Sequence, residues 1–390
     1  MNKKKFLGGL CFFLLVGCLL VGSLTLSQET QHTRQKIEQK SHKKLSVKER
    51  KYLKKVKAIS EYTEHRLQKS GFTGEALLIK DGKVVYQQGY GYADVDNQVP
   101  NGSKTTYQIA SLQKSATAMM IMLLANKGKL SLNDHLAKYY PNIKNGNLVT
   151  LRQMLNMTSG TNLATMPRNV LTATALVNYV SHKIQINVKQ IGHQSYQPAN
   201  YVLLAGILQK ITQHSYEDSF NTMIRKPLKL KNTYFFNEEQ AQSQKALAYT
   251  QVKGKQLRRI KEQAFQYSNE LGTGNLYMST PDLYKMLSSF LDGKFLTQTE
   301  TRLLYTTFPP RNNYSAGLYH LAQLPEFKKL GITSGYHVHG YEYGYETVGD
   351  LSANGKDAVI LQTNVANLHK PFNLVLDADL YHALLQTFKK

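Results

Sequence analysis

A serine and a lysine three positions apart, Ser111 and Lys114, are the side chains whose types and spacing best fit catalysis. Residues three apart on a helix share one face, so the amine of Lys114 can reach the hydroxyl of Ser111 one turn away. A serine is a weak nucleophile until a base takes its proton, and a partly buried lysine can be that base when its surroundings favour the neutral amine. The pair therefore predicts nucleophilic catalysis by Ser111.

The spacing alone is weak evidence, because Ser41 and Lys44 repeat it in a basic, polar stretch where no site is expected. Ser111 differs in its position, since a strand-like segment at 107–110 passes there into a helical pattern at 111–126. Backbone N–H groups at the start of a helix have no acceptor within the helix. The N–H of Ser111 is therefore available to stabilise an oxyanion.

The patterns along the chain indicate which elements would hold this pair. Two apolar runs, 75–80 and 83–88, flank Asp81-Gly82, which is a strong signal for a β-hairpin. Helical spacing marks 47–69 and much of 130–290, and strand-like segments follow at 315–321, 332–339 and 357–363, before a last helix near 372–388. We expect an α/β fold with an antiparallel five-stranded sheet built from both ends of the chain and flanked by helices. An all-helical subdomain would be inserted at about 130–290.

The composition is that of a folded, strongly basic protein. Of 390 residues, 42% are hydrophobic and 19% charged, which excludes a disordered or fibrous chain. Lys and Arg total 49 against 26 Asp and Glu, so the net charge is +23 and favours polyanionic surroundings. The two cysteines, Cys11 and Cys18, both lie in the N-terminal apolar stretch. The body therefore has no disulfide framework, thiol nucleophile or Cys-ligated metal.

The N-terminus is typical of an export signal. Lys3 to Lys5 precede an uncharged run at 6–27, which is long enough to span a bilayer as a helix. We expect 1–27 to be a membrane anchor, 28–46 a basic linker and 47–390 an extracellular domain. The sequence Leu-Val-Gly-Cys that ends at Cys18 also matches a lipobox, so a lipoprotein is the alternative. Export argues against a nucleic-acid partner.

Several short stretches follow one another in the order found in a known enzyme family. They are 74–82, 107–114, 157–160, 201–204, 226–233 and 274–280, the last followed by Asp282. Over about residues 71–385 the chain resembles the serine β-lactamase and penicillin-binding-protein superfamily, in its class-C-like, low-molecular-weight branch. The resemblance implies a sheet domain and a helical domain with the site at their junction, and an acyl-enzyme on Ser111. We expect no cofactor.

The resemblance also assigns the second motif of the family, Tyr-Ser-Asn or Tyr-Ala-Asn, to 196–198. Tyr196 corresponds to the tyrosine that shuttles the proton together with the lysine. Pro198 stands where the family has the Asn that donates to the amide of a peptide or β-lactam. Because proline offers neither an N–H nor a polar side chain, recognition of peptides and β-lactams is put in doubt. The missing Asn does not affect the expected chemistry of Ser111, Lys114 and Tyr196.

The third motif, Lys-Thr-Gly or His-x-Gly on a strand, corresponds to the segment that precedes Gly344-Tyr345. Gly340 is then the motif glycine, and the N–H of Tyr341 is the second oxyanion donor. A glycine fits because substrate must approach the strand backbone closely. This register leaves Val338 at the basic position of the motif.

Two histidines flank that basic position. A β-bulge could bring either His337 or His339 into the site, where it would bind substrate, and one of the two could instead have a purely structural role. Alternatively, both could hold a metal ion, since residues two apart on a strand share a face. No third ligand follows from the spacing of the remaining histidines, so we expect no metal.

The expected substrate is a D-alanyl group of the cell envelope. A D-alanyl ester on anionic teichoic or lipoteichoic acid fits the exported domain, the basic charge and the missing motif Asn, and some relatives with an altered second motif look like esterases of this kind. A D,D-carboxypeptidase or penicillin-binding protein that acts on the peptidoglycan stem peptide is the alternative. A catalytically degenerate protein that only binds a wall polymer is the second alternative.

Overall fold

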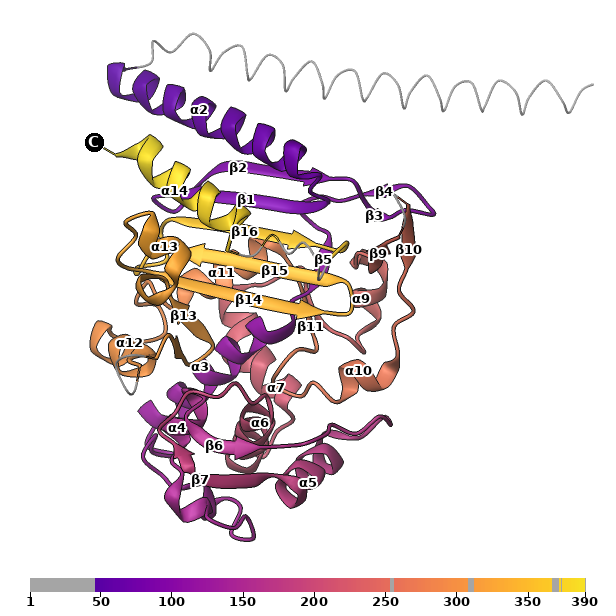
Figure 1. Cartoon of the computed structure of the whole chain (residues 1–390), viewed down its shortest axis with the longest axis vertical. Helices are drawn as coiled ribbons and strands as arrows, with labels where there is room; N and C mark the ends of the chain where they lie inside the picture. Colours follow the sequence, from indigo (N-terminus) through magenta and orange to yellow (C-terminus); the bar gives the residue numbers. More distant parts are fainter. Residues whose placement is uncertain (1–45, 253–255, 308–311, 367–371, 373, 390) are drawn as a thin grey trace, which may run out of the picture. The chain divides into compact units, whose positions relative to one another are not determined.

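Figure 1 shows the computed structural model, which describes residues 46–252, 256–307, 312–366, 372 and 374–389. The predicted anchor at 1–27 and all but the last residue of the linker at 28–46 lie outside the described residues. The chain divides into two compact units, Met1–Lys55 and Val56–Lys390, and the site lies in the second. Within the described part of the chain, none of the helices combines the length and the apolar character needed to cross a membrane.

A seven-stranded antiparallel sheet forms the centre of the second unit, in the order β12-β13-β14-β15-β16-β1-β2. Its strands are β12 (Tyr314–Ser315), β13 (Leu318–His320), β14 (Tyr336–Glu342), β15 (Tyr345–Leu351), β16 (Ala358–Thr363), β1 (Gly74–Lys80) and β2 (Lys83–Tyr90). The predicted hairpin is confirmed, because β1 and β2 pair across Asp81-Gly82, both in the left-handed region that a tight hairpin turn requires. Both ends of the chain contribute strands, as the sequence predicted.

The sheet has two strands more than the predicted five. The segment predicted as one strand at 315–321 is a hairpin of β12 and β13, which turns at Ala316-Gly317, both with positive φ. β15 was not predicted, although all seven of its residues are buried. Because Glu346, Thr347 and Asp350 are polar, the sequence lacks the apolar run expected of a buried strand.

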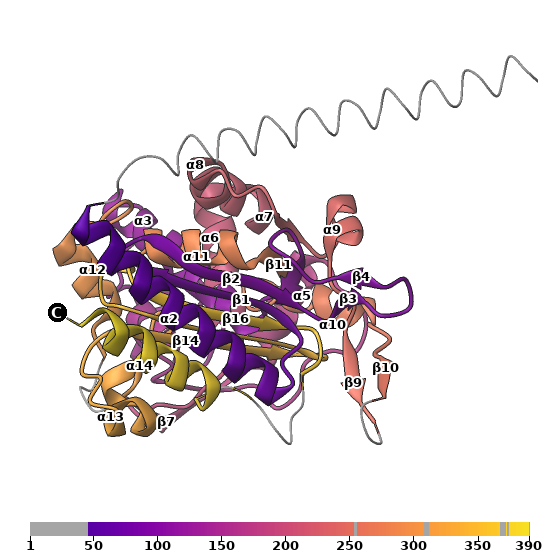
Figure 2. The ribbon, with the colours of Figure 1, turned by 90° about the horizontal axis from the view of Figure 1, so that it is seen from above.

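Helices cover both faces of the sheet (Figures 1 and 2). On one face α14 (Leu376–Phe388) packs on β15 and β16. The helix α2 (Val47–Ser70) contacts α14 through an ion pair between Arg66 and Asp379. On the other face α11 (Thr280–Ser289) packs on β1 and β16, and the segment that carries Ser111 packs on β14. The two faces of β14 therefore meet different surroundings.

The middle of the chain is mainly helical but contains short strands, so the all-helical insertion was wrong in this detail. Its helices and those that follow are α3 (Gln113–Asn126), α4 (Leu151–Leu155), α5 (Ala173–Lys183), α6 (Ala199–Thr212), α7 (Tyr216–Phe220), α8 (Lys226–Leu228), α9 (Glu239–Gln244), α10 (Ala264–Ser268), α12 (Gln298–Tyr305) and α13 (Pro325–Lys329). The remaining strands are β3 (Tyr92–Asp94) with β4 (Val99–Pro100), β6 (Ser159–Asn162) with β7 (Gln185–Ile191), β9 (Tyr249–Gln251) with β10 (Leu257–Arg259), and β5 (Thr106–Gln108), β11 (Leu276–Ser279) and β8 (Thr233–Phe235).

The helix α3 lies at the centre of this part. Every residue from Gln113 to Met122 is buried, so α3 has no solvent-exposed stripe there. It packs against α6 and α7, and its N-terminus points toward the sheet. A helix buried on all sides holds its first turn rigidly, and that turn carries Lys114.

Candidate active site

Ser111 and Lys114 meet at the start of α3. Ser111 lies in a short 3-10 turn, Ala110–Leu112, which runs directly into α3. The side-chain nitrogen of Lys114 donates a hydrogen bond of 3.0 Å to Ser111 Oγ. The one-turn spacing therefore brings nucleophile and amine together, as the sequence predicted.

The backbone at Ser111 is tightly constrained. Ala110, the residue before it, has a φ of +47°, a left-handed conformation that a residue with a side chain adopts only at a cost of about 1–2 kcal/mol. Gly340 of β14 lies against the same segment, because a Cβ there would stand 2.3 Å from the carbonyl oxygen of Ile109. The strand can approach Ser111 this closely only with a glycine at 340.

Lys114 is almost fully buried, with 1% of its surface exposed. Besides Ser111 Oγ, its nitrogen donates to the carbonyl oxygen of Thr273 at 3.2 Å. The same nitrogen lies 5.4 Å from the ring centre of Tyr196. Lys114 thus links the serine to the tyrosine of the second motif and to the loop between α10 and β11.

Tyr196 lies in the loop that leads into α6, with 43% of its surface exposed. Its ring packs edge-on against buried Tyr314, at a centroid distance of 5.8 Å. Its hydroxyl makes no hydrogen bond to any residue that the structure describes, so it is available to a substrate. Pro198 is the N-cap of α6 and offers no side-chain hydrogen bond there, in line with the predicted loss of the amide-recognising Asn.

Two carboxyl groups beside Lys114 were not predicted from the sequence. Glu270 accepts a hydrogen bond from the hydroxyl of Thr273, and its carboxylate lies beside Gly274, where a Cβ would stand 3.2 Å from Glu270 Oε2. Burial raises the pKa of Glu270, and the Lys114 ammonium offsets part of that rise. Burial likewise raises the pKa of Glu342 to about 7; the Glu270 carboxylate adds to the rise, and Lys114 again opposes it.

One signal in the sequence pointed to Glu342. Alternate residues of a strand share a face, so Glu342 lies on the same side of β14 as Val338 and Gly340. For Glu270 the sequence holds no comparable signal, because it belongs to the loop after α10 and reaches the site through tertiary packing.

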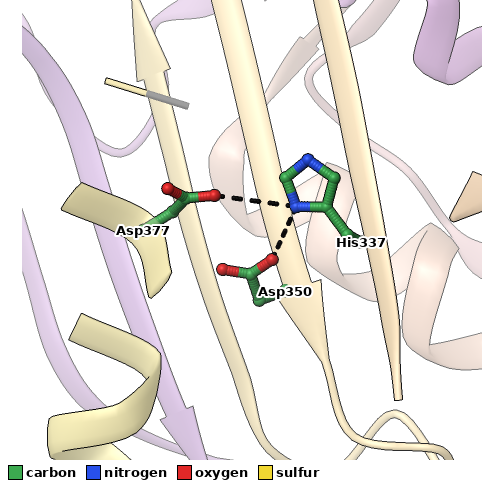
Figure 3. A group of neighbouring side chains, drawn as sticks. All are labelled: His337, Asp350 and Asp377. Carbon is green, nitrogen blue, oxygen red and sulfur yellow. Dashed lines mark hydrogen bonds and ion pairs between the residues drawn. The ribbon is translucent and has the colours of Figure 1, made fainter. Parts of the chain in front are cut away.

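The histidines of β14 do not line the site, which corrects the expectation that His337 or His339 binds substrate. β14 pairs with β15 from Tyr336 to Glu342 without a register shift, so no bulge turns either side chain over. Both point to the face that α14 covers, where His337 Nδ1 lies 2.7 Å from Asp350 and His339 Nε2 lies 3.1 Å from Glu346. Figure 3 shows His337 beside Asp350 and Asp377.

Gly340 and the N–H of Tyr341 keep the positions that the register gave them. Within the described strands, β13 pairs only with Tyr336 and His337 of β14, so the rest of that edge has no strand partner. An open strand edge beside a nucleophile offers backbone donors to a substrate. The N–H of Tyr341 as an oxyanion donor remains a prediction.

The arrangement of an antiparallel sheet, a buried helix that begins with Ser-x-x-Lys, and a facing strand glycine agrees with the resemblance. The model of the family described as Beta-lactamase matches residues 59–352. The chain belongs to the Beta-lactamase family. The prediction of a serine hydrolase of this superfamily is thereby confirmed.

Two relatives are more than a quarter identical to this chain over the aligned residues. PbpX of Bacillus subtilis (strain 168), a candidate penicillin-binding protein, is 28% identical over 87% of this chain and 83% of its own length. A teichoic acid D-alanine hydrolase of Staphylococcus aureus is 27% identical over 82% of this chain and 80% of its own.

Solved structures share the same fold. FmtA from Staphylococcus aureus superposes with a TM-score of 0.72 at 24% identity, covering 85% of this chain and 88% of its own. The D-amino acid amidase from Ochrobactrum anthropi SV3 superposes with a TM-score of 0.67 at 21% identity, covering 86% and 97%. The predicted fold class is confirmed by both.

Proposed function

We propose that this chain is a serine hydrolase of the cell envelope that removes D-alanyl groups from their esters on teichoic or lipoteichoic acid. The observation that carries the proposal is the pair of carboxyl groups, Glu270 and Glu342, whose charges interact with Lys114 beside Ser111. A D-alanyl ester has a free ammonium group on the carbon next to the carbonyl that Ser111 would attack. Carboxylates beside the nucleophile are suitable partners for such an ammonium.

A peptidoglycan stem peptide lacks this feature. The amino group of its penultimate D-alanine is part of a peptide bond and therefore carries no charge. Such a substrate instead requires a donor and acceptor for its amide, and Pro198 supplies no side-chain donor where the family has Asn. The two carboxyl groups would form no ion pair with an uncharged amide, whereas they can with a substrate ammonium.

A polar pocket beside Tyr196 suits the alcohol side of the ester. It has a volume of about 670 Å³ and lies between the paired strands β6 and β7 and the loop that carries Tyr196. Half of its ten lining residues carry side-chain amides: Asn162, Gln185, Asn187, Gln190 and Gln197. Side-chain amides both donate and accept hydrogen bonds, as a polyol phosphate requires.

The charge of the chain supports the same substrate, and we propose a location that matches it. The net charge of +23 favours association with a polyphosphate. We further propose that the apolar run at 6–27 anchors the chain, with lipidation at Cys18 as the alternative, so that the domain acts outside the cell. The relative named teichoic acid D-alanine hydrolase supports this assignment.

The proposed reaction proceeds in two steps. Ser111 Oγ attacks the ester carbonyl, and its proton passes to the pair of Lys114 and Tyr196. The N–H groups of Ser111 and Tyr341 stabilise the oxyanion. Lys114 and Tyr196 then give this proton to the leaving alcohol oxygen, and the product on the enzyme is the ester D-alanyl-Ser111. In the second step, water attacks this ester. D-alanine is released, and Ser111 regains its proton.

A comparison of two esters tests the proposal at the carboxylates. The full chain, purified in detergent, is given a D-alanyl ester of glycerol phosphate and its N-acetylated form. We expect kcat/KM to be at least about tenfold higher for the free ammonium form. Glu342→Gln should reduce that preference, whereas Glu239→Gln, a change at an exposed glutamate, should not.

Other outcomes would assign the site differently. Equal rates for both esters, or faster cleavage of a peptide that ends in D-Ala-D-Ala, would contradict the proposal and favour the carboxypeptidase. Salt-sensitive binding of lipoteichoic acid without release of D-alanine would favour a wall-polymer binding protein.

A further inference from the structure

On the face of the sheet opposite Ser111, three ionisable side chains from separate elements meet. Figure 3 shows His337 from β14, Asp350 from β15 and Asp377 from the first turn of α14. His337 Nδ1 lies 2.7 Å from Asp350 Oδ1 and 3.6 Å from Asp377 Oδ2. One ligand atom from each residue lies within 4.8 Å of the other two.

This group, which we call the His-Asp-Asp cluster, is buried. His337 is 2% exposed and both aspartates are 0% exposed. Asp350 Oδ2 and both carboxylate oxygens of Asp377 have no hydrogen-bond partner among the described residues. An oxygen buried without a partner costs about 1–3 kcal/mol, and more when it carries charge. One of these unpartnered oxygens, Asp377 Oδ2, faces His337 Nδ1 at 3.6 Å.

We propose that the His-Asp-Asp cluster binds one divalent first-row transition-metal ion, with Zn²⁺ as the reference. A neutral imidazole and two carboxylates carry a charge of −2, which a divalent cation cancels within the cluster. Bonds of about 2.0–2.2 Å to nitrogen and oxygen around zinc place tetrahedral ligands roughly 3.4 Å apart. The two separations from His337 Nδ1, 2.7 and 3.6 Å, lie on either side of that value.

The ligand types select the class of metal. Imidazole nitrogen suits zinc and its transition-metal neighbours, whereas calcium and magnesium prefer oxygen ligands alone. Because Asp350 and Asp377 both have unpartnered oxygens, bidentate carboxylates can supply the remaining ligand positions. No residue of the cluster faces Ser111, so the ion would not take part in the hydrolysis.

A metal ion in the His-Asp-Asp cluster would stabilise β14, the strand that lies against Ser111. β14 carries Gly340 and Tyr341 on or beside the face turned to Ser111, and the cluster ties that strand to β15 and to α14. A metal ion that binds only the folded chain stabilises it by mass action. We therefore expect the metal to raise the melting temperature.

The alternative is a metal-free cluster in which the aspartates are protonated or share a proton. The two cases predict different changes in melting temperature for one substitution. If a metal binds, Asp377→Asn removes a ligand and lowers the melting temperature. If none binds, the neutral amide replaces a buried acid without a partner, and the melting temperature stays the same or rises.

The test uses the full chain with Cys11→Ser and Cys18→Ser, so that no thiol competes for metal. Chains expressed with added zinc are dialysed, and their metal content and melting temperature are measured with and without dipicolinate. Asp379→Asn is the matched control, because it lies two residues away on α14 and pairs with Arg66 instead.

We expect about one metal ion per chain in the parent and in Asp379→Asn, and less than a tenth of that in Asp377→Asn. Dipicolinate should lower the melting temperature of the first two chains, and added Zn²⁺ should restore it. A metal-free parent whose melting temperature does not respond to Zn²⁺, Mn²⁺ or dipicolinate would overturn the proposal. This parent measurement decides the matter even if Asp377→Asn fails to fold.

Discussion

The side-chain nitrogen of Lys114 lies 3.0 Å from Ser111 Oγ and donates its hydrogen bond to that oxygen. For Ser111 to attack a carbonyl, a neighbouring group must accept the proton of its hydroxyl. Tyr196 is the neighbour best placed to complete the transfer, because its ring lies 5.4 Å from the same nitrogen. We therefore treat lysine and tyrosine as one proton-transfer unit.

The first prediction concerns this unit. Tyr196→Phe should lower kcat by about 10²–10⁴, which is the typical contribution of a positioned acid–base group. Tyr314→Phe is the control, since Tyr314 packs under the same ring and its buried hydroxyl has no hydrogen-bond partner within the described residues. Steady-state rates on a D-alanyl ester measure both. A Tyr196→Phe rate within threefold of the parent would exclude the tyrosine from proton transfer.

The second prediction concerns the contact between β14 and the serine turn. Gly340→Ala places a methyl group 2.3 Å from the carbonyl oxygen of Ile109, so the strand must move away from Ser111. We expect kcat/KM to fall by at least about tenfold and the melting temperature to drop by several degrees, since overpacking costs about 1–3 kcal/mol. Gly102→Ala, at a position with open space around it, should change neither. Full activity in Gly340→Ala would show that the strand does not position the nucleophile.

The third prediction follows from the pKa of Glu342, which burial raises to about 7. If its carboxylate binds the substrate ammonium, the binding form is the ionised one, which accumulates as pH rises. The kcat/KM for a D-alanyl ester should therefore increase with pH through about 7. In Glu342→Gln that rise should disappear, leaving a lower and flatter profile. An unchanged profile in the variant would assign the titration to another group.

The fourth prediction concerns stability and lies away from the site. Burial raises the pKa of Glu75 in β1 from its ordinary value of 4.5 to about 7, and the Gln87 amide opposes that rise. Between these values the unfolded chain loses a proton that the folded chain keeps, so ionisation favours unfolding as pH rises. Glu75→Gln should therefore melt a few degrees above the parent at pH 8 and match it near pH 4. Equal melting temperatures at both pH values would show that Glu75 ionises freely.

The sequence predicted those elements that neighbouring residues specify by themselves. The Asp81-Gly82 turn and the alternating apolar runs beside it specified the first hairpin, and the helix after Ser111 followed from its apolar spacing. β15 was missed because Glu346 and Asp350 give it a polar sequence although it is buried. Each of these acids is next to a histidine of β14, a pairing that arises only after the strands assemble.

Within the site, too, some residues were predictable from the sequence and others were not. Ser111 and Lys114 were predictable because one helical turn joins them, and Tyr196 was placed through the family resemblance. The histidines were misassigned because sequence spacing cannot tell which face of β14 turns toward the serine. The regular pairing with β15 decides that question and turns them away. Glu270 could not be found, since only the packed loop after α10 brings it near Lys114.

The most direct test of the account is the release of D-alanine from D-alanylated lipoteichoic acid by the full chain, compared with Ser111→Ala. The account predicts multiple turnovers of free D-alanine for the parent and only the uncatalysed background for the variant, with both chains still binding the polymer. Release at the parental rate by Ser111→Ala would contradict it, and so would a parent that binds the polymer but releases no D-alanine.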